Sequence, residues 1–481
     1  MAYKHGVYTN EQATSLVAPV VATAGLQVVI GTAPVNQASD PYHCTNVPML
    51  ANTLDGATAA VGYSDDYENY TLCQSMGASF KVKKVAPMVL INVLDPDKHK
   101  KNLTEKTVQI NSGVAVLEEK GVLLDKLVVK AASATLTAGT DYTAAFDDNG
   151  YVNIVVIPGG AGKSATSLTV SGVQIDPSAV TPADIVGAVS AAGVESGMEC
   201  IRMIFPKLNM VPGILIAPGW SENAIVSAGL QAKTTHINGV FNCVCIVDID
   251  SSSTGATKYD DVKQQKEKQA VTSANCYAVW LYAKVGDAIY AGSAMAAAVT
   301  VATDADNGDI PNVSPSNKTV PISAACLKDG TEVLLDQEQA NVVNSFGVAT
   351  WLNINGFRLW GNNTAAYPGN TDPKDRWFSV RRFLSWAANS FILTYFSKVD
   401  SPANKRLIEA IVDSENVRGN GFVARGVCAR YEVIYDEAEN TTADLLDGKI
   451  TFHQYITPYT PAEDIEDVIE FDPDALTTAL S

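Results

Sequence analysis

The sequence predicts an α/β protein with a small all-β insertion and an α+β C-terminal region. Apolar strand patterns alternate with helical patterns over residues 18–102 and 191–340, which favours a mainly parallel sheet with right-handed crossovers. Between them, residues 103–190 are rich in Val, Thr, Ala and Gly and carry closely spaced turn signals, as in an all-β unit. Long amphipathic helices and two strands are predicted over residues 341–462. At roughly 150 residues per domain, the 481 residues suggest about three domains.

Composition narrows the classes of function. Apolar residues make up 47% of the chain and the formal net charge is −18. A chain this acidic lacks the basic footprint of a nucleic-acid-binding protein and is repelled by anionic membranes. No run approaches the roughly 18 apolar residues of a membrane span, and the apolar run "LVAPVVATAG" has no basic cluster before it. We therefore expect no nucleic-acid partner, no membrane insertion and synthesis in the cytoplasm.

The spacing of the cysteines and histidines predicts neither disulfide bonds nor a metal site. The eight cysteines are scattered, and none stands in a CxxC pair. Cys243 and Cys245 share one face of the predicted strand in "FNCVCIVDID", as buried thiols do. The five histidines show no zinc-ligand spacing. Buried free thiols, with no metal and no cofactor, are the expectation.

The α/β segments are predicted from apolar runs without alternation. "LQVVIGTAP" and "APMVLINVLDP" are typical of strands covered on both faces, and "GILIAPG" and "NCYAVWLYAKV" repeat the pattern after residue 190. "TPADIVGAVSAAGVESG" (181–197) predicts a helix with Thr181 as cap and Pro182 at its first position. The lysine-rich joint "DKHKKNLTEK" marks the start of the β insertion.

Within the insertion, the stretch "GGAGKSA" (159–165) has two possible interpretations, a phosphate-binding loop and a hairpin loop. A phosphate-binding loop needs a glycine five positions before Gly162, where this chain has Ile157, and a helix after Ser164, where the pattern is that of a strand. We predict a hairpin loop and no nucleotide.

A search for catalytic chemistry at the strand ends finds little. Asp248 and Asp250 close one predicted strand, and His236 is near in sequence. No Gly-x-Ser-x-Gly elbow occurs, and further oxygen ligands for a cation are not evident. The calcium-loop-like stretch 304–312 lacks the closing glutamate. The prediction is no catalytic site, no metal site and no enzyme.

The two ends of the chain differ from its interior. Residues 1–17 form a polar N-terminal arm, and residues 463–481 form an acidic C-terminal arm. Each has an extended, part-apolar centre: His5, Gly6, Val7 and Tyr8 in the first, and Ile465, Val468, Ile469 and Phe471 in the second. Alone, neither is able to stay folded. From the residues alone, each is either a strand added to an exposed sheet edge or a disordered tail.

The stretch "INGFRLWGNNT" (354–364) places large side chains between two glycines. Its residues of interest are Gly356, Phe357, Arg358, Trp360 and Gly361. Two interpretations are open, a small-ligand site and a rigid structural corner.

Several segments, in order along the chain, resemble the contractile tail sheath proteins of phages. They are "YAGSAMAAAVTVATDADNGDIPNVSPSNKTV" (290–320), "NSFGVATWLNINGFRLWGNNT" (344–364), "VRRFLSW" (380–386), "GNGFVARG" (419–426) and "DLLDGKITFHQYITPYTPAEDI" (444–465). The resemblance is good over residues 285–470, moderate over the α/β core and weak at the N-terminal arm. Asn362 and Asn363 depart from it, because many members have an arginine after the Trp-Gly. Residues 103–190 lie outside the common core.

The resemblance implies a subtilisin-like α/β core without the protease triad. It implies stacked hexameric rings around an inner tube, linked by arms that neighbouring copies exchange. The implied partners are other copies of the chain, a tail tube protein, and baseplate and tail terminator proteins. Such a protein is made in the bacterial cytoplasm and ends in the tail of a phage or of a tail-like bacteriocin particle. Contraction drives the tube through the target envelope.

Two site assignments follow from this comparison. The 356–361 stretch becomes a structural corner, with Phe357 and Trp360 packed against helices within 375–416 and Arg358 paired with an acidic neighbour. Lys405 and Arg406 become candidate contacts to the tube. Two other classes stay open: a hydrolase with a subtilisin-like core, and a particle protein that binds glycans through residues 103–190.

Overall fold

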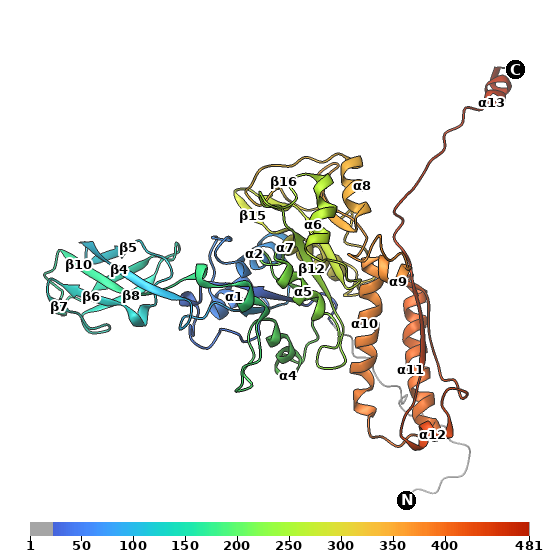
Figure 1. Ribbon diagram of the computed structural model, residues 1–481, viewed down its shortest axis with the longest axis horizontal. Helices are drawn as coiled ribbons and strands as arrows, with labels where there is room; N and C mark the ends of the chain where they lie inside the picture. The colour runs from blue at the N-terminus through green and yellow to red at the C-terminus, as the bar shows by residue number, and fades with distance from the viewer. Residues whose placement is uncertain (1–22, 481) are drawn as a thin grey trace, which may run out of the picture.

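The computed structural model describes residues 23–480, and at its centre lies an eight-stranded sheet (Figure 1). The inner strands run parallel, and an antiparallel strand closes each edge. In spatial order the strands are β18 (Phe357–Trp360), β17 (Val348–Asn353), β13 (Cys276–Trp280), β12 (Val244–Ile249), β11 (Ile214–Ile216), β1 (Gln27–Gly31), β3 (Met88–Asn92) and β2 (Met49–Ala51). The predicted mixed α/β architecture with a mainly parallel sheet is confirmed.

The central strands are buried along their whole length, which explains their unbroken apolar sequences. Helix α7 (Gly292–Asp306) packs on β11, β12 and β13, and α2 (Leu72–Met76) packs on β1. The sheet also contacts α1 (Leu54–Val61), α5 (Ala224–Ala232), α6 (Val262–Lys268) and α8 (Gln337–Ser345). A three-stranded sheet lies beside this core, with the order β15 (Ala288–Tyr290), β14 (Tyr282–Val285) and β16 (Ala324–Cys326).

The insertion is a separate antiparallel sheet with a hydrophobic core of its own. Its seven strands are β7 (Ala134–Thr135), β6 (Val128–Ala131), β10 (Ser167–Ile175), β4 (Lys100–Asn111), β5 (Val114–Leu117), β9 (Val152–Val156) and β8 (Tyr142–Phe146). It projects from the core at the left of Figure 1. The chain enters it through β4 and leaves it through β10, and these two strands pair with each other at its base.

Two sequence predictions in this region are wrong. The helix predicted over 181–197 is only α3 (Pro182–Val186), although Thr181 and Pro182 cap it as expected. It stops because Gly187 takes a φ of +71°, and a Cβ there would collide with the Ser196 carbonyl oxygen. The loop 159–165 is not a hairpin, because it joins β9 to β10 and these strands are not neighbours in the sheet.

The C-terminal region is built on two long helices. They are α10 (Phe378–Tyr395), which follows the short α9 (Pro373–Arg376), and α11 (Lys405–Ala424). Strands β19 (Cys428–Ile434) and β20 (His453–Pro458) form an antiparallel hairpin beside α11, with α12 (Thr442–Leu446) in the connection. The chain then runs without helix or strand to α13 (Pro473–Leu480). Residues 421–424 form the last turn of α11.

Other expectations concern cysteines, metals and membranes. All eight cysteines are free and buried, as predicted. Over residues 23–480 no cluster of three or more His, Cys, Asp or Glu side chains is placed to hold a metal ion. Within the same residues, the helices are too short or too polar to cross a bilayer.

Candidate assembly surface

An aromatic cluster joins the two long helices to the hairpin. Phe422 of α11 lies with its ring centroid 6.3 Å from that of Phe383 and 5.7 Å from that of Trp386, both on α10. On its other side Phe422 packs on Tyr431 of β19, at 5.5 Å. Contacts of this kind add to the stabilisation from buried area. The helices and the hairpin therefore form one packed unit.

A buried polar network ties the same elements together. Glu415 and Arg418 of α11 form an ion pair of 2.7 Å with both side chains buried. The Tyr431 hydroxyl donates to the Glu415 carboxylate at 3.1 Å, and the Gln454 amide of β20 donates to that hydroxyl at 2.7 Å. Burial raises the pKa of Tyr431 well above its usual value, so the hydroxyl stays protonated. Sequence patterns did not reveal this network, because its members come from three elements.

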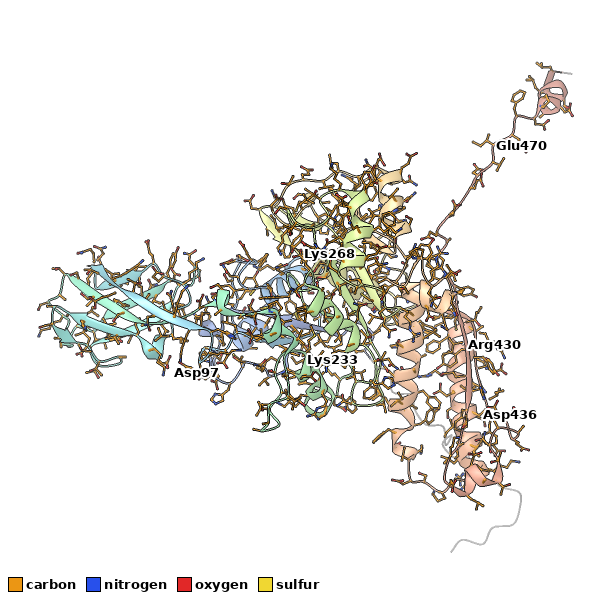
Figure 2. The ribbon with its side chains drawn as sticks, in the orientation of Figure 1. Asp97, Lys233, Lys268, Arg430, Asp436 and Glu470 are labelled. Atoms are coloured by element: carbon orange, nitrogen blue, oxygen red, sulfur yellow. The ribbon has the colours of Figure 1, made fainter. Side chains whose placement is uncertain are left out.

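The C-terminal arm leaves this unit and touches little. Three of its apolar side chains are almost fully exposed: Ile465 at 85%, Ile469 at 88% and Phe471 at 81%. Val468 is 70% exposed. Figures 1 and 2 show the segment extending away from the body, with Glu470 next to α13 and away from the other elements. An extended, apolar segment without contacts is typical of a piece that is completed by another molecule.

The first residues of this arm contact the rest of the protein. Arg376 pairs with Glu463 at 2.8 Å, and both side chains are partly buried. The Arg376 guanidinium also stacks over Trp377 at 4.0 Å and donates to the Asn363 side chain at 2.9 Å. A polar pocket lined by Asn341, Asn344, Trp360 and residues 461–465 lies beside the pair. The arm therefore departs in a fixed direction. The N-terminal arm residues His5, Gly6, Val7 and Tyr8 lie outside the described residues.

The stretch 356–361 forms the edge strand of the main sheet. Gly356 has a φ of +99° in the turn before β18. At Gly361 a Cβ would lie 2.9 Å from the Cα of Ala349, so the close approach of two backbones requires glycine there. Phe357 is buried in the main core. The assignment of this stretch as a structural corner stays a prediction.

One detail of that prediction is wrong. Arg358 donates to the main-chain oxygens of Ile354 and Asn317, at 3.2 and 3.0 Å, and not to an acidic group. Trp360 donates from its indole N–H to Asn341 of α8 at 3.2 Å. Its hydrogen bond is therefore to α8 and not to the helices within 375–416. The polar loop 317–320 runs along β18 and supplies carbonyls where an acidic partner was expected.

Lys405 and Arg406 lie in the first turn of α11, after the Asn404 cap. Both are exposed, and the Lys405 ammonium lies 3.6 Å from Glu409 one turn further along. Such an exposed pair contributes little to stability, so both cations are accessible to another molecule. Their contact with a tube stays a prediction.

The carboxyl ends of the parallel strands hold a closed polar cluster. Asp248, at 2% exposure, accepts hydrogen bonds from Ser221 at 2.8 Å and from the Ser293 hydroxyl at 2.6 Å. Burial raises the pKa of Asp248 above its usual value. Nearby, Glu222 accepts from Tyr282 and pairs with Lys328. Within residues 23–480 no histidine contacts this cluster, so its serines and Asp248 do not form a serine–histidine–acid triad.

Comparisons with known proteins agree with one another. No family model matches the chain. It is 27% identical over 479 residues to the tail sheath protein of Burkholderia phage BcepMu, which covers 96% of this chain and 95% of that protein. It is 25% identical over 302 residues to a putative prophage major tail sheath protein of Pseudomonas aeruginosa, covering 62% and 74%. The tail sheath protein of Escherichia phage P2 is 24% identical over 303 residues, covering 60% and 70%.

Solved structures show the same fold. The contracted PVC sheath complex of an extracellular contractile injection system matches with a TM-score of 0.58, at 13% identity and over 99% of each chain. The contracted helical sheath of the anti-feeding prophage matches with a TM-score of 0.56, at 15% identity, over 98% of this chain and 99% of that one. Along nearly its whole sequence the chain is therefore similar to the tail sheath proteins of phages, and it shares the fold of contractile injection system sheaths.

Proposed function

We propose that this chain is the structural subunit of a contractile tail sheath, which polymerises into stacked hexameric rings around a tail tube. Contraction of the sheath then drives the tube through the target cell envelope. The observation that carries the proposal is the C-terminal arm, whose apolar residues Ile465, Ile469 and Phe471 are exposed on an extended segment. Such a segment gains hydrogen bonds and burial only when it joins the sheet of another copy.

The energy for contraction is stored at assembly, with no nucleotide involved. Each subunit needs to contribute only a few kcal/mol between two packings of largely rigid units, because a ring of many copies adds these contributions. The arms keep neighbours connected while the units move. Arg376 and Glu463 fix where one arm begins.

The finer proposals follow the family. The core is subtilisin-like without a protease triad, and no catalytic step, metal or cofactor takes part. The chain divides into units at about 18, 103, 191, 341 and 463, with arms at both ends. The partners are other copies of the chain, the tail tube, the baseplate and a tail terminator, and Lys405 and Arg406 contact the tube. The chain is made in the bacterial cytoplasm and assembles into a particle tail.

The proposal is tested by imaging the purified full-length protein. Negative-stain electron microscopy at rising protein concentration is expected to show tubes with a helical repeat. Solitary globules at every concentration would contradict it.

A matched pair of variants locates the effect in the C-terminal arm. Ile469→Asp together with Phe471→Asp places charge on the contact side of the arm and is expected to abolish tubes. Val194→Asp, which changes a side chain of 66% exposure in a loop, is the control and leaves assembly unchanged. Equal assembly by both variants would show that the arm is dispensable.

The N-terminal arm is tested separately. Deletion of residues 1–12 is expected to prevent long, ordered sheaths while the soluble protein remains folded. Long sheaths with rings still linked through the same sheet would contradict the role of this arm.

A further inference from the structure

We propose that the polar pocket beside Arg376 and Glu463 binds a neutral saccharide, a function beyond the assembly of a sheath. The pocket has a volume of about 580 Å³, within the roughly 300–1,000 Å³ that is typical of small-molecule sites. Its walls come mainly from the loop 314–317, helix α8, residues 360–363 after β18 and the start of the C-terminal arm. Helix α8 and the start of the arm lie beside the main sheet in Figure 1.

Amide and hydroxyl groups dominate the lining of this pocket. Five of the lining residues are asparagines, and one glutamine and three serines join them. An apolar ligand would leave these groups without hydrogen bonds, which costs free energy. Trp360 and Tyr367 add aromatic rings to the same walls. The ligand that fits is therefore polar, with a less polar face that packs on an aromatic ring.

The charges in the lining disfavour ionic ligands. They belong to one arginine, Arg376, and to two acids, Glu463 and Asp464. The Arg376 guanidinium already pairs with Glu463 at 2.8 Å and donates to the Asn363 side chain at 2.9 Å, so it is engaged before an anion arrives. A multivalent cation needs several oxygen ligands, and the remaining carboxylate of Asp464 supplies too few. The ligand that fits is therefore neutral.

Three asparagine side chains are held in fixed orientations, each by one end. The Asn341 oxygen accepts from the Trp360 indole N–H at 3.2 Å, and the Asn362 oxygen accepts from the Ser314 hydroxyl at 2.6 Å. Asn344 is oriented the other way, because its nitrogen donates to two main-chain carbonyls, both at 2.9 Å. Among residues 23–480, the other ends of these three amides have no hydrogen-bond partner. Two N–H donors and one oxygen acceptor are therefore left for a ligand.

Such a set of groups matches a sugar ring. Each hydroxyl of a sugar both donates and accepts, so it is able to bond to the amide nitrogens of Asn341 and Asn362 and to the oxygen of Asn344. The hydroxyls stand at the rim of the ring, whereas its faces carry C–H groups that pack on an aromatic side chain such as Trp360. Because the amides are already oriented, little conformational entropy is lost on binding.

Saturation-transfer NMR with the full-length protein tests the site. The probes are maltose, cellobiose and N,N′-diacetylchitobiose, and at least one is expected to bind with a dissociation constant on the order of 1 mM. Absence of binding by all three would overturn the inference. Spermidine and citrate are the ionic probes, and binding of either of them without binding of a sugar would overturn it as well.

Two variants locate the sugar in the pocket. Asn341→Asp keeps the oxygen that Trp360 uses and removes the amide donor, and Asn362→Asp does the same for the oxygen that Ser314 uses. Each variant is expected to weaken sugar binding by about 10-fold, because one hydrogen bond to the ligand is lost. Unchanged affinity in both variants would place the sugar elsewhere and overturn the inference.

The matched control is Gln339→Glu, which makes the same change of charge on the same helix. The Gln339 side-chain oxygen accepts from the Asp336 N–H at 3.2 Å, a bond that glutamate keeps, and the residue lies outside the pocket lining. Its affinity for the sugar is expected to equal that of the original protein. Equal weakening in Gln339→Glu and Asn341→Asp would show an effect of charge alone, which contradicts a neutral ligand.

The length of the ligand separates two sources of the sugar. The disaccharide that binds is compared with a soluble polymer of the same unit, such as soluble starch for maltose. Binding of both assigns the site to units inside a glycan chain, and binding of the disaccharide alone assigns it to a free sugar or a chain end. Either result supports a saccharide site.

Discussion

Arg382 of α10 and Asp304 of α7 form a buried bidentate ion pair that joins the C-terminal helices to the core. The Arg382 Nη1 donates to Asp304 Oδ1 at 2.9 Å, a second N–H donates to Oδ2, and the side chains are 3% and 1% exposed. The same guanidinium donates to the Ala24 carbonyl at 3.2 Å, next to β1. Both residues belong to segments that carry the family resemblance, so one contact connects two of its motifs.

We expect Arg382→Ala to lower the free energy of unfolding by about 3–5 kcal/mol, because it leaves the Asp304 carboxylate buried and unpaired. Urea unfolding of the unassembled protein measures the loss. The control is Arg381→Ala. Arg381 lies 3.5 Å from its partly exposed partner Asp375, so this variant should lower the free energy of unfolding by less than about 1 kcal/mol. Equal losses for the two variants would show that the buried pair does not hold the joint.

Two glycines of α11 should respond to alanine in opposite directions. A Cβ at Gly419 would lie 2.5 Å from the Tyr431 carbonyl oxygen, whereas a Cβ at Gly421 meets no atom within 4 Å. Gly419→Ala should therefore destabilise the protein by about 1–3 kcal/mol through overpacking. Gly421→Ala should stabilise it by about 0.5–1 kcal/mol through helix propensity. Thermal unfolding of the two variants measures both changes in stability. A loss of stability in Gly421→Ala would contradict the packing described for α11.

Glu222 should make stability depend on pH near neutrality. Burial raises the pKa of its carboxyl to about 7, although the Lys328 ammonium and the Tyr282 hydroxyl favour the charged form. Since the folded pKa lies above that of the unfolded chain, the stabilising contribution is complete below about pH 4.3 and is lost as the pH rises through about 7. The loss is on the order of 3 kcal/mol for a shift of this size.

Glu222→Gln removes that titration, because an amide does not ionise. The difference in unfolding free energy between the variant and the original protein should therefore change between pH 5 and pH 8, in favour of the variant at the higher pH. A constant offset from the lost Lys328 contact does not alter this slope. Two stability curves that stay parallel over the range would contradict the assignment.

The anchor of the C-terminal arm should affect assembly more than folding. Glu463→Gln removes the charge that pairs with Arg376, a partly exposed contact worth less than about 1 kcal/mol. We expect nearly unchanged thermal unfolding and a higher protein concentration for assembly, measured by sedimentation. Glu267→Gln, which changes an exposed residue of α6 outside the arm, is the control. A large loss of thermal stability in Glu463→Gln would show that the anchor holds the fold itself.

Local patterns in the sequence determined most of the elements. Unbroken apolar runs such as "LQVVIGTAP" and "APMVLINVLDP" predict strands, because a strand covered on both faces needs apolar side chains in both directions. The Asn404 cap and the periodicity after it fix the start of α11 in the same way. The family motifs, read in order, indicated the class of protein, and the acidic, part-apolar sequence of residues 463–481 predicted the C-terminal arm.

Only the tertiary structure decided how distant segments meet. Helix α11 continues through Gly419 because the missing Cβ lets it approach Tyr431, a contact that no local propensity encodes. Arg358 finds carbonyls of a passing loop where an acidic partner was expected, and Arg382 finds Asp304 far away in the sequence. Periodicity reports which face of a segment is buried, whereas the partner on that face depends on the path of the whole chain.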